Sequence, residues 1–215
     1  FFAHCIRRGY IVENPARDIK NLKKGAKFRE AIPEEVLQRI FNYLWVKGEK
    51  YYLLACYLLY SCFIRPSEIC ELKLSNISFK NQTIFISENF SKNRKNQIVT
   101  MPINVARLMI DLEIYKYPSD YYIIGHDFQP SERKCTDKIL RAKWLQVRKA
   151  LQLSDKYQFY SLKDSGITKM LNVIDVAEVR DQARHSNIAI TDVYTDRSKA
   201  QGNEHIKHLN FTPLA

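Results

Sequence analysis

A nearly continuous apolar stretch, EKYYLLACYLLYSCF, runs from Glu49 to Phe63. A helix that is apolar almost all round has no face for solvent, so this segment is predicted to be the central helix of the core. The preceding segment, IPEEVLQRIFNYLWVKG, carries apolar residues at helical spacing after Pro33 and two glutamates. Proline suits the first turn of a helix and acidic side chains suit the positive end of its dipole, so a second helix is predicted to begin here.

Two short runs rich in β-branched residues, TIFIS and QIVTMP, are separated by the polar segment ENFSKNRKN. They are predicted to pair as an antiparallel hairpin with a long basic tip. The rest of the chain has helical periodicity. The helices predicted from it cover residues 103–116, 136–151, 161–173, 175–184 and 188–197. The expected fold class is therefore α+β, mainly α with one small antiparallel β-sheet.

The N-terminal stretch FFAHCIRRGYIVENPARDI is predicted to be the last part of a helix that stops before Asn14, because the residue before a proline disfavours helical backbone. It continues into KNLKKGAKFREAI, a basic segment with the composition of a linker. A solvated connector and a segment that follows a DNA backbone share this composition. A domain boundary is predicted near residue 30, which divides the chain into residues 1–29 and 30–215.

Composition and charge narrow the classes of function. The chain is 46% hydrophobic and 12% aromatic, which indicates a folded globular protein. No run of about eighteen apolar residues occurs, so no membrane-spanning helix is expected. The first residues lack both the layout of a secretion signal and an initiator methionine, which suggests a fragment of a longer protein. The formal net charge of +11 favours a polyanion as partner, with nucleic acid ahead of a membrane surface.

Cysteine and histidine usage gives no sign of a metal site. The five cysteines are scattered through mostly apolar runs without any Cys-x-x-Cys pair, so neither zinc ligation nor a disulfide framework is expected. Free thiols of this kind are typical of a reducing cytosol. His205 and His208 lie three residues apart in the tail, but no cysteine lies near them, and a metal site is not expected there.

The first candidate for chemistry is Arg65, which stands between the apolar helix and Pro66. The planar fork of an arginine suits two phosphate oxygens, and Glu68 follows close enough to orient it. A helix-capping ion pair between Arg65 and Glu68 explains the same residues. Taken alone, this segment favours the capping pair.

Two further groups of polar residues have both a functional and a structural interpretation. Lys92, Arg94 and Lys95 in the hairpin tip could reach into a groove of a ligand, or could form a solvated turn. Tyr160 and Lys163 lie three residues apart at a predicted helix start, so both can point the same way. Taken alone, this second pair favours a surface helix start.

The segment RHSNIAITDVYTDR places Tyr194 nine residues after His185. A core tyrosine normally has apolar neighbours on its own helix face. Tyr194 stands among threonines and aspartates, so its hydroxyl could reach a substrate.

The order of these motifs resembles the tyrosine recombinase (phage integrase) family. RPSE is similar to the family's T-G-x-R-x-S-E-L segment, with Arg65 and Glu68 in register, and HSNIAITDVYT is similar to its G-H-x-x-x-x-T-x-x-Y-T-H segment, with His185 and Tyr194 in register. SKNRKNQIVTMPI resembles the family's catalytic hairpin, and the N-terminal stretch resembles the last helix of the core-binding domain. The resemblance implies a catalytic domain of the DNA breaking-rejoining type over residues 30–215, with the end of a core-binding (SAM-like) domain and a linker at residues 1–29.

The chain departs from the family pattern at three positions. Tyr160 and Lys163 stand where the family usually has His-x-x-Arg. The lysine keeps the positive charge but loses the two-pronged grip on a phosphate, and the tyrosine can donate a hydrogen bond but is no acid or base near neutral pH. Arg184 replaces the glycine that usually precedes the histidine, where it is less suited to the turn but adds a cation. These changes are interpreted as a coherent variant of the family.

The resemblance implies a site-specific recombinase of a mobile element, of the integrase or transposon-excision type. Tyr194 would attack phosphorus to form a 3′-phosphotyrosyl link and release a 5′-hydroxyl, while Arg65 and Lys163 hold the non-bridging oxygens. His185 and Tyr160 would add hydrogen bonds. No metal, ATP or other cofactor is expected, because the phosphotyrosine bond stores the energy of the broken phosphodiester.

Three supporting roles complete the implied site. Lys92 is the expected general acid for the leaving oxygen, Lys95 is the fallback, and Glu68 supports Arg65. The implied DNA-binding residues are Lys23, Lys24, Lys27, Arg94, Lys95 and Arg184.

Two other functions compete with the recombinase. A regulator that kept the fold and lost catalysis is favoured by Tyr160 and Lys163, whereas the retained His185 and Tyr194 argue against it. A type IB topoisomerase shares the catalytic logic, but the N-terminal stretch favours a recombinase. The expected partners are double-stranded DNA and further copies of the chain, as a homotetramer on DNA and a monomer without it. The C-terminal tail could pack on a neighbouring subunit or on its own core. The expected location is the bacterial cytosol, on nucleoid DNA.

Overall fold

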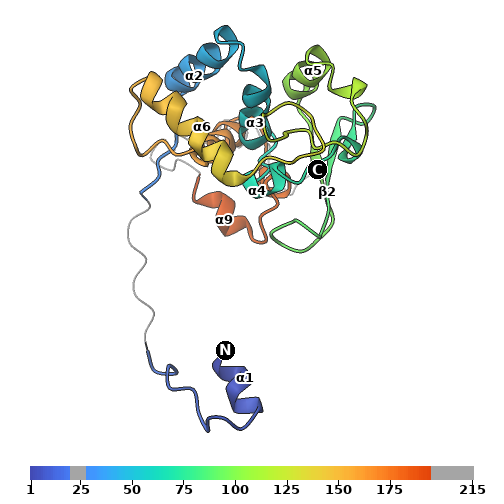
Figure 1. Cartoon of the computed structure of the whole chain (residues 1–215). Coiled ribbons are helices and arrows are strands. Elements are labelled where there is room, and N and C mark those ends of the chain that lie inside the picture. Colours follow the sequence, from blue (N-terminus) through green and yellow to red (C-terminus); the bar gives the residue numbers. More distant parts are fainter. Residues whose placement is uncertain (20–27, 195–215) are drawn as a thin grey trace, which may run out of the picture.

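The computed structural model of the chain describes residues 1–19 and 28–194 (Figure 1). Lys23, Lys24 and Lys27 of the basic linker and the C-terminal tail lie outside these residues. Helix α1 (Phe2–Arg7) has no buried residue and lies apart from the other elements in Figure 1. No described helix is long and apolar enough to cross a membrane.

The core is built around helix α3 (Lys50–Tyr60), as the apolar stretch predicts. Helix α2 (Glu34–Val46), helix α5 (Ile103–Asp111) and helix α7 (Ser161–Leu171) pack against it. Most of α3 is buried, and even the hydroxyl of Tyr52 is satisfied internally, because it donates a 2.9 Å hydrogen bond to the carbonyl of Leu140. The close contact between α3 and α7 depends on Gly166, where a Cβ atom would lie 1.8 Å from the carbonyl oxygen of Tyr60.

The predicted hairpin is confirmed as strands β2 (Thr83–Ile86) and β3 (Gln97–Thr100). They pair antiparallel with Ile84 opposite Val99, and both of these side chains are buried. A two-residue strand, β1 (Ile77–Ser78), pairs with β2 and completes a sheet of order β1-β2-β3. The sequence pattern did not predict β1, which is too short to show a period of two. The architecture, mostly helical with one small antiparallel sheet, is as predicted.

The remaining elements follow the predicted order. A short helix, α4 (Pro66–Ile69), begins at Pro66, and α6 (Asp137–Ala150) and α8 (Val176–Ala183) begin at side-chain caps. Single-turn 3₁₀ helices occupy Leu74–Asn76 and Ile114–Lys116. The last described helix, α9 (Ile188–Asp192), lies beside the hairpin loop at the lower edge of the main body in Figure 1.

Three predicted helices end too late. The N-terminal helix stops at Arg7, because Gly9 takes the left-handed conformation that terminates helices. The helix predicted over 103–116 breaks after Asp111, since Glu113 has a φ of 53° and cannot continue it. Helix α9 ends at Asp192. Tyr194 follows in a turn, in which its backbone amide donates a hydrogen bond to the carbonyl of Thr191.

Candidate active site

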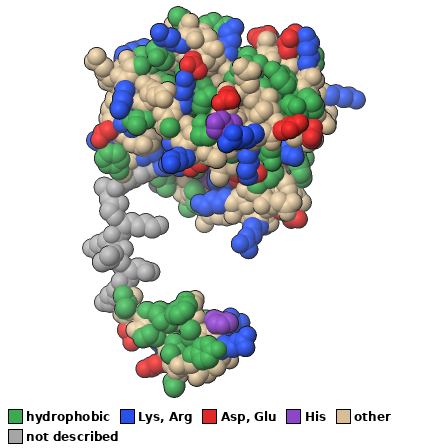
Figure 2. All heavy atoms as spheres, viewed as in Figure 1, with side chains coloured by type: hydrophobic (Ala, Val, Ile, Leu, Met, Phe, Trp, Pro, Cys, Tyr) green, Lys and Arg blue, Asp and Glu red, His purple; other side chains and the backbone are tan. Residues whose placement is uncertain are grey.

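A cavity of about 650 Å³ opens between α4, the hairpin loop, the start of α7 and the segment from α8 to α9. Figure 2 shows Lys and Arg side chains projecting from the edge of the protein where Figure 1 places α9 and the hairpin loop. The described lining carries five cationic side chains and one carboxylate, Asp137, which pairs with one of these cations. The cations are Arg29, Arg65, Lys92, Arg141 and Arg184. This surplus of positive charge suits a polyanionic ligand.

Arg65 forms the capping pair that its sequence favours and also reaches the cavity. It is the N-cap of α4, where its backbone amide and its Nη1 donate to the Glu68 carboxylate at 2.9 and 3.0 Å. Its side chain also lines the cavity. Because the capping pair fixes the guanidinium in place, it prepares Arg65 for a ligand instead of competing with that role.

Glu68 connects three parts of the site from a fully buried position. Besides Arg65, it accepts a 2.5 Å hydrogen bond from Nη2 of Arg184 and a longer one, 3.4 Å, from the amide of Lys92. Burial alone would raise the pKa of the Glu68 carboxyl, but Arg184 and Arg65 hold it below its ordinary value. Glu68 is therefore ionised and fixes both guanidinium groups.

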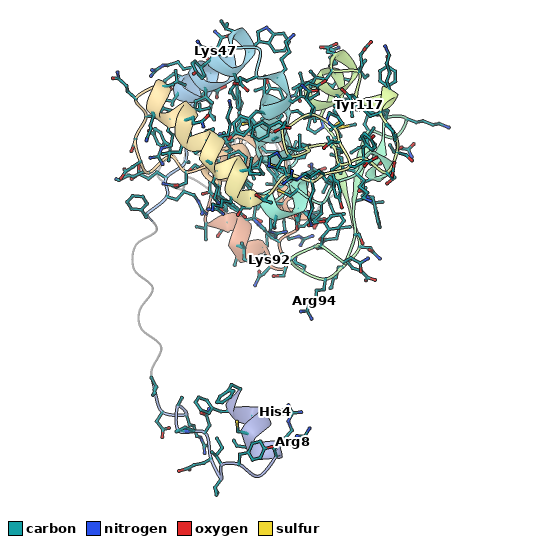
Figure 3. The ribbon with its side chains drawn as sticks, viewed as in Figure 1. His4, Arg8, Lys47, Lys92, Arg94 and Tyr117 are labelled. Atoms are coloured by element: carbon teal, nitrogen blue, oxygen red, sulfur yellow. The ribbon has the colours of Figure 1, made fainter. Side chains whose placement is uncertain are left out.

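The structure separates the candidate cations of the hairpin loop. Lys92 lines the cavity, whereas Arg94 and Lys95 do not. Figure 3 shows Lys92 between α9 and the loop, with Arg94 pointing away from the protein. The side-chain amide of Asn93 donates a 3.0 Å hydrogen bond to the carbonyl of Arg184, which joins the loop to the end of α8.

Tyr160 and Lys163, at the start of α7, lie in different environments. Tyr160 lines the cavity, with the Arg29 guanidinium 4.5 Å above its ring. Lys163 is 1% exposed and does not line the cavity, because its Nζ donates to the carbonyls of Phe63 and Ala183 at 2.6 and 3.4 Å. Burial, followed by the charges of Arg65 and Arg184, lowers the pKa of Lys163 well below its usual value.

Arg184 and His185 form the turn after α8. Arg184 has the left-handed conformation (φ 56°, ψ 46°) in which glycine is usually found, and the turn closes with hydrogen bonds to the carbonyls of Asp181 and Arg180. Nδ1 of His185 lies 2.9 Å from the hydroxyl of Thr191. Burial, followed by the charges of Lys163, Arg65 and Arg184, lowers the pKa of His185 to about 4, so its ring is neutral near pH 7.

The hydroxyl of Tyr194 points to Asp164, a residue that follows Lys163 directly. It donates a 2.8 Å hydrogen bond to Oδ1, while Nε of Arg29 donates to Oδ2 at 2.5 Å. Burial and the Asp164 charge raise the pKa of the Tyr194 hydroxyl. Its ring is stacked near that of His185, with centroids 6.4 Å apart.

The sequence did not single out Asp164 for the site, and it assigned Arg29 only to the linker. One feature distinguishes Asp164: it is an acidic residue in α7, and the first seven residues of this helix are all buried. No sequence signal connects Arg29 with Asp164, because 135 residues separate them.

The chain is similar in sequence or in fold to several known proteins. A model of the phage integrase family matches residues 30–201. A tyrosine recombinase of Pseudothermotoga lettingae is 26% identical over 190 residues, which are 85% of this chain and 61% of the relative, so the chain spans less than two thirds of that protein. A structure of the Tn1549 transposon integrase with a circular intermediate DNA aligns with a TM-score of 0.69 and 15% identity, covering 91% of this chain and 71% of the other. A lambda integrase dimer bound to a core site aligns with a TM-score of 0.68 and 17% identity, covering 94% and 71%.

Proposed function

The chain belongs to the phage integrase family, and from this membership we propose that the protein cleaves and rejoins DNA strands as a site-specific recombinase of a mobile element. The proposal rests mainly on the fact that the candidate residues meet in one cavity. Arg65, Lys92, Tyr160, His185 and Tyr194 come from distant parts of the chain and line one cationic cavity. This set contains a nucleophile, cations for a phosphate and a candidate acid, which is the equipment for transesterification at phosphorus.

The proposed reaction begins with the scissile phosphate in the cavity. A pentacovalent transition state gathers negative charge on its non-bridging oxygens, and the fixed guanidinium of Arg65 is placed to stabilise that charge. The Tyr194 oxygen forms a bond to phosphorus while the bond to the 5′ oxygen breaks. The Asp164 carboxylate already accepts the hydrogen bond of the tyrosine, so it is the acceptor in position for its proton.

Two further groups act on the same phosphate. Lys92 donates a proton to the leaving 5′ oxygen, and its place in the cavity supports it over Lys95. His185, neutral near pH 7, and the hydroxyl of Tyr160 contribute hydrogen bonds without titrating. The predicted contact of Lys163 with a non-bridging oxygen requires its ammonium to leave the carbonyls of Phe63 and Ala183.

The proposal extends to partners and context. The phosphotyrosyl bond preserves the energy of the phosphodiester, so rejoining by a second 5′-hydroxyl needs no cofactor. The proposed partners are double-stranded DNA and three further copies of the chain, in a homotetramer that forms on the DNA. Residues 1–29 are proposed to end a core-binding domain that completes a clamp around the duplex, and the reaction is placed on bacterial nucleoid DNA.

The test is covalent trapping with the full-length parent protein. A nicked duplex from the ends of the element, without added metal, lets the short fragment with the new 5′-hydroxyl diffuse away and leaves the protein attached to the 3′-phosphate. We expect an adduct that resists denaturation in the wild type and is absent in Tyr194→Phe. If the protein binds this duplex and no adduct forms, the regulator with lapsed catalysis takes the place of the recombinase. Relaxation of supercoiled DNA of any sequence would favour the topoisomerase.

A further inference from the structure

Arg184 is an arginine in a position that does not favour one. Its left-handed backbone carries an energetic cost for any residue with a Cβ atom, and its side chain is only 2% exposed. A buried charge also carries a large desolvation cost unless it is well paired. The surrounding structure therefore holds this guanidinium at the cavity despite two free-energy costs, the left-handed backbone and the desolvation of the charge.

The pairing of Arg184 is incomplete. Its Nη2 donates to Glu68 and, at 3.4 Å, to the carbonyl of Phe63. Its Nε and Nη1 are buried and have no hydrogen-bond partner within residues 1–19 and 28–194. A guanidinium has five donor hydrogens, and buried donors without acceptors are strongly unfavourable. Since Arg184 lines the cavity, an anion bound there can supply the missing acceptors.

Glu68 holds Arg184 next to Arg65. One carboxylate oxygen accepts from Arg65 at 3.0 Å and the other accepts from Arg184 at 2.5 Å, so one buried anion orients both guanidinium groups. Both residues line the cavity. Two planar forks fixed in this way match the two non-bridging oxygens of one phosphodiester.

Lys163 and Arg184 share a hydrogen-bond acceptor. Its ammonium and Nη2 of Arg184 both donate to the carbonyl oxygen of Phe63, at 2.6 and 3.4 Å. The lysine is buried and does not itself line the cavity. Its contacts fix the carbonyls of Phe63 and Ala183, and the second of these belongs to the residue before Arg184.

We propose that Arg184 binds the scissile phosphate as the second guanidinium of the site. Lys163 is a residue that positions Arg184 through the carbonyls of Phe63 and Ala183. This inference rests on the proposed function. The departures at Lys163 and Arg184 then form one arrangement. Arg184, in the turn after α8, supplies the guanidinium that binds the phosphate, and the buried Lys163 of α7 supports it.

The first experiment compares Arg184→Gly and Arg180→Gln with the wild type in the full-length protein. Glycine suits the left-handed backbone, so Arg184→Gly keeps the turn. Arg180 is the control because it is a partly exposed arginine of α8, the helix that Arg184 follows, and its guanidinium pairs with Asp181 and does not line the cavity. On the nicked duplex at saturating protein, we expect Arg184→Gly to slow adduct formation about 100-fold or more, as removal of a positioned charge does. Arg180→Gln leaves the rate unchanged. An Arg184→Gly rate equal to wild type overturns the inference.

The second experiment separates phosphate binding from structural support. In a duplex with a methylphosphonate at the scissile position, a methyl group replaces one non-bridging oxygen and the negative charge is lost. An arginine that neutralises this charge is then dispensable, so the deficit of Arg184→Gly relative to wild type shrinks at least tenfold on this substrate. A deficit of equal size on both substrates makes the role of Arg184 structural and overturns the inference.

Lys163→Met supplies the opposing test. If the lysine acts by positioning Arg184, its deficit shrinks on the methylphosphonate together with that of Arg184→Gly. If the methylphosphonate relieves Lys163→Met and not Arg184→Gly, the lysine binds the phosphate and the inference is wrong. Absence of any Tyr194-dependent adduct in the wild type instead removes the proposed function, so the two failures are distinguishable.

Discussion

The hydroxyl of Tyr194 and the carboxylate of Asp164 are joined by a 2.8 Å hydrogen bond across 30 residues of sequence. Arg29 holds the other oxygen of the same carboxylate, so the tyrosine is fixed within the cavity by a charged pair that the protein builds itself. A nucleophile held in this way needs little rearrangement when a phosphate enters, and the cost of ordering it is met during folding.

Asp164→Asn lowers the pKa of Tyr194. A neighbouring negative charge stabilises the neutral phenol, and its removal favours the phenolate. Burial remains the largest cause of the raised value, so the pKa stays above that of a free tyrosine. NMR of ring-¹³C tyrosine across a pH titration measures the change, with Tyr194→Phe to assign the signal. An unchanged titration in Asp164→Asn would show that the carboxylate does not act on this hydroxyl.

Lys92→Ala slows cleavage by about 10²- to 10⁴-fold, the usual contribution of a positioned general acid, and Lys95→Ala has a small effect. A substrate with sulfur in place of the 5′ bridging oxygen distinguishes acid catalysis from DNA binding, because a thiolate leaves without protonation. We expect this substrate to restore most of the rate of Lys92→Ala. Restoration in Lys95→Ala and not in Lys92→Ala would reverse the assignment of the two lysines.

His185 makes folding stability depend on pH. Its pKa falls from 6.5 to about 4 in the folded protein, so between these values the unfolded chain binds more protons. The contribution of His185 to stability is therefore complete above pH 6.5 and is lost as the pH falls toward 4. Urea unfolding at about pH 7.5 and about pH 5 should show a larger loss of stability for wild type than for His185→Gln, which cannot titrate. Equal losses would contradict the depressed pKa.

Glu68→Gln removes the charge that holds Arg65 and Arg184. Two guanidinium groups are then left without their shared anion, one of them fully buried, so we expect the unfolding free energy to fall by about 3 kcal/mol. Urea denaturation at neutral pH measures this change. Glu88→Gln, at an exposed position of the hairpin loop, is the control and should stay within about 0.5 kcal/mol of wild type. A Glu68→Gln value as small as that of the control would mean that the carboxylate is not the anchor of the site.

Much of the fold could be predicted from local pattern. The apolar stretch 49–63 became α3, and the β-branched runs became β2 and β3 with the basic segment between them. The errors lie at helix ends, where one residue decides the outcome. Gly9 and Glu113 each take a left-handed conformation that a periodicity averaged over several turns does not detect.

The candidate site could be predicted in part. The motif order identified Arg65, Tyr160, His185 and Tyr194, and all four line the cavity. Lys163 was grouped with Tyr160 from their spacing, yet only Tyr160 reaches the cavity. Spacing along a helix defines which side chains are neighbours, but it does not define which of them meets the neighbouring helix and which meets the solvent.

The sequence by itself determined most of the secondary structure, the excess of positive charge and the order of the motifs, because each depends on the residue types or on residues close together in the chain. The tertiary structure decided which buried polar groups pair with one another. Only the packing of α7 against α3 at Gly166 places Lys163 under the carbonyl of Phe63. Only the folded chain brings Glu68 to Arg184, a pair 116 residues apart. Buried charges select partners by proximity in space, and that proximity arises from the packing of the whole core.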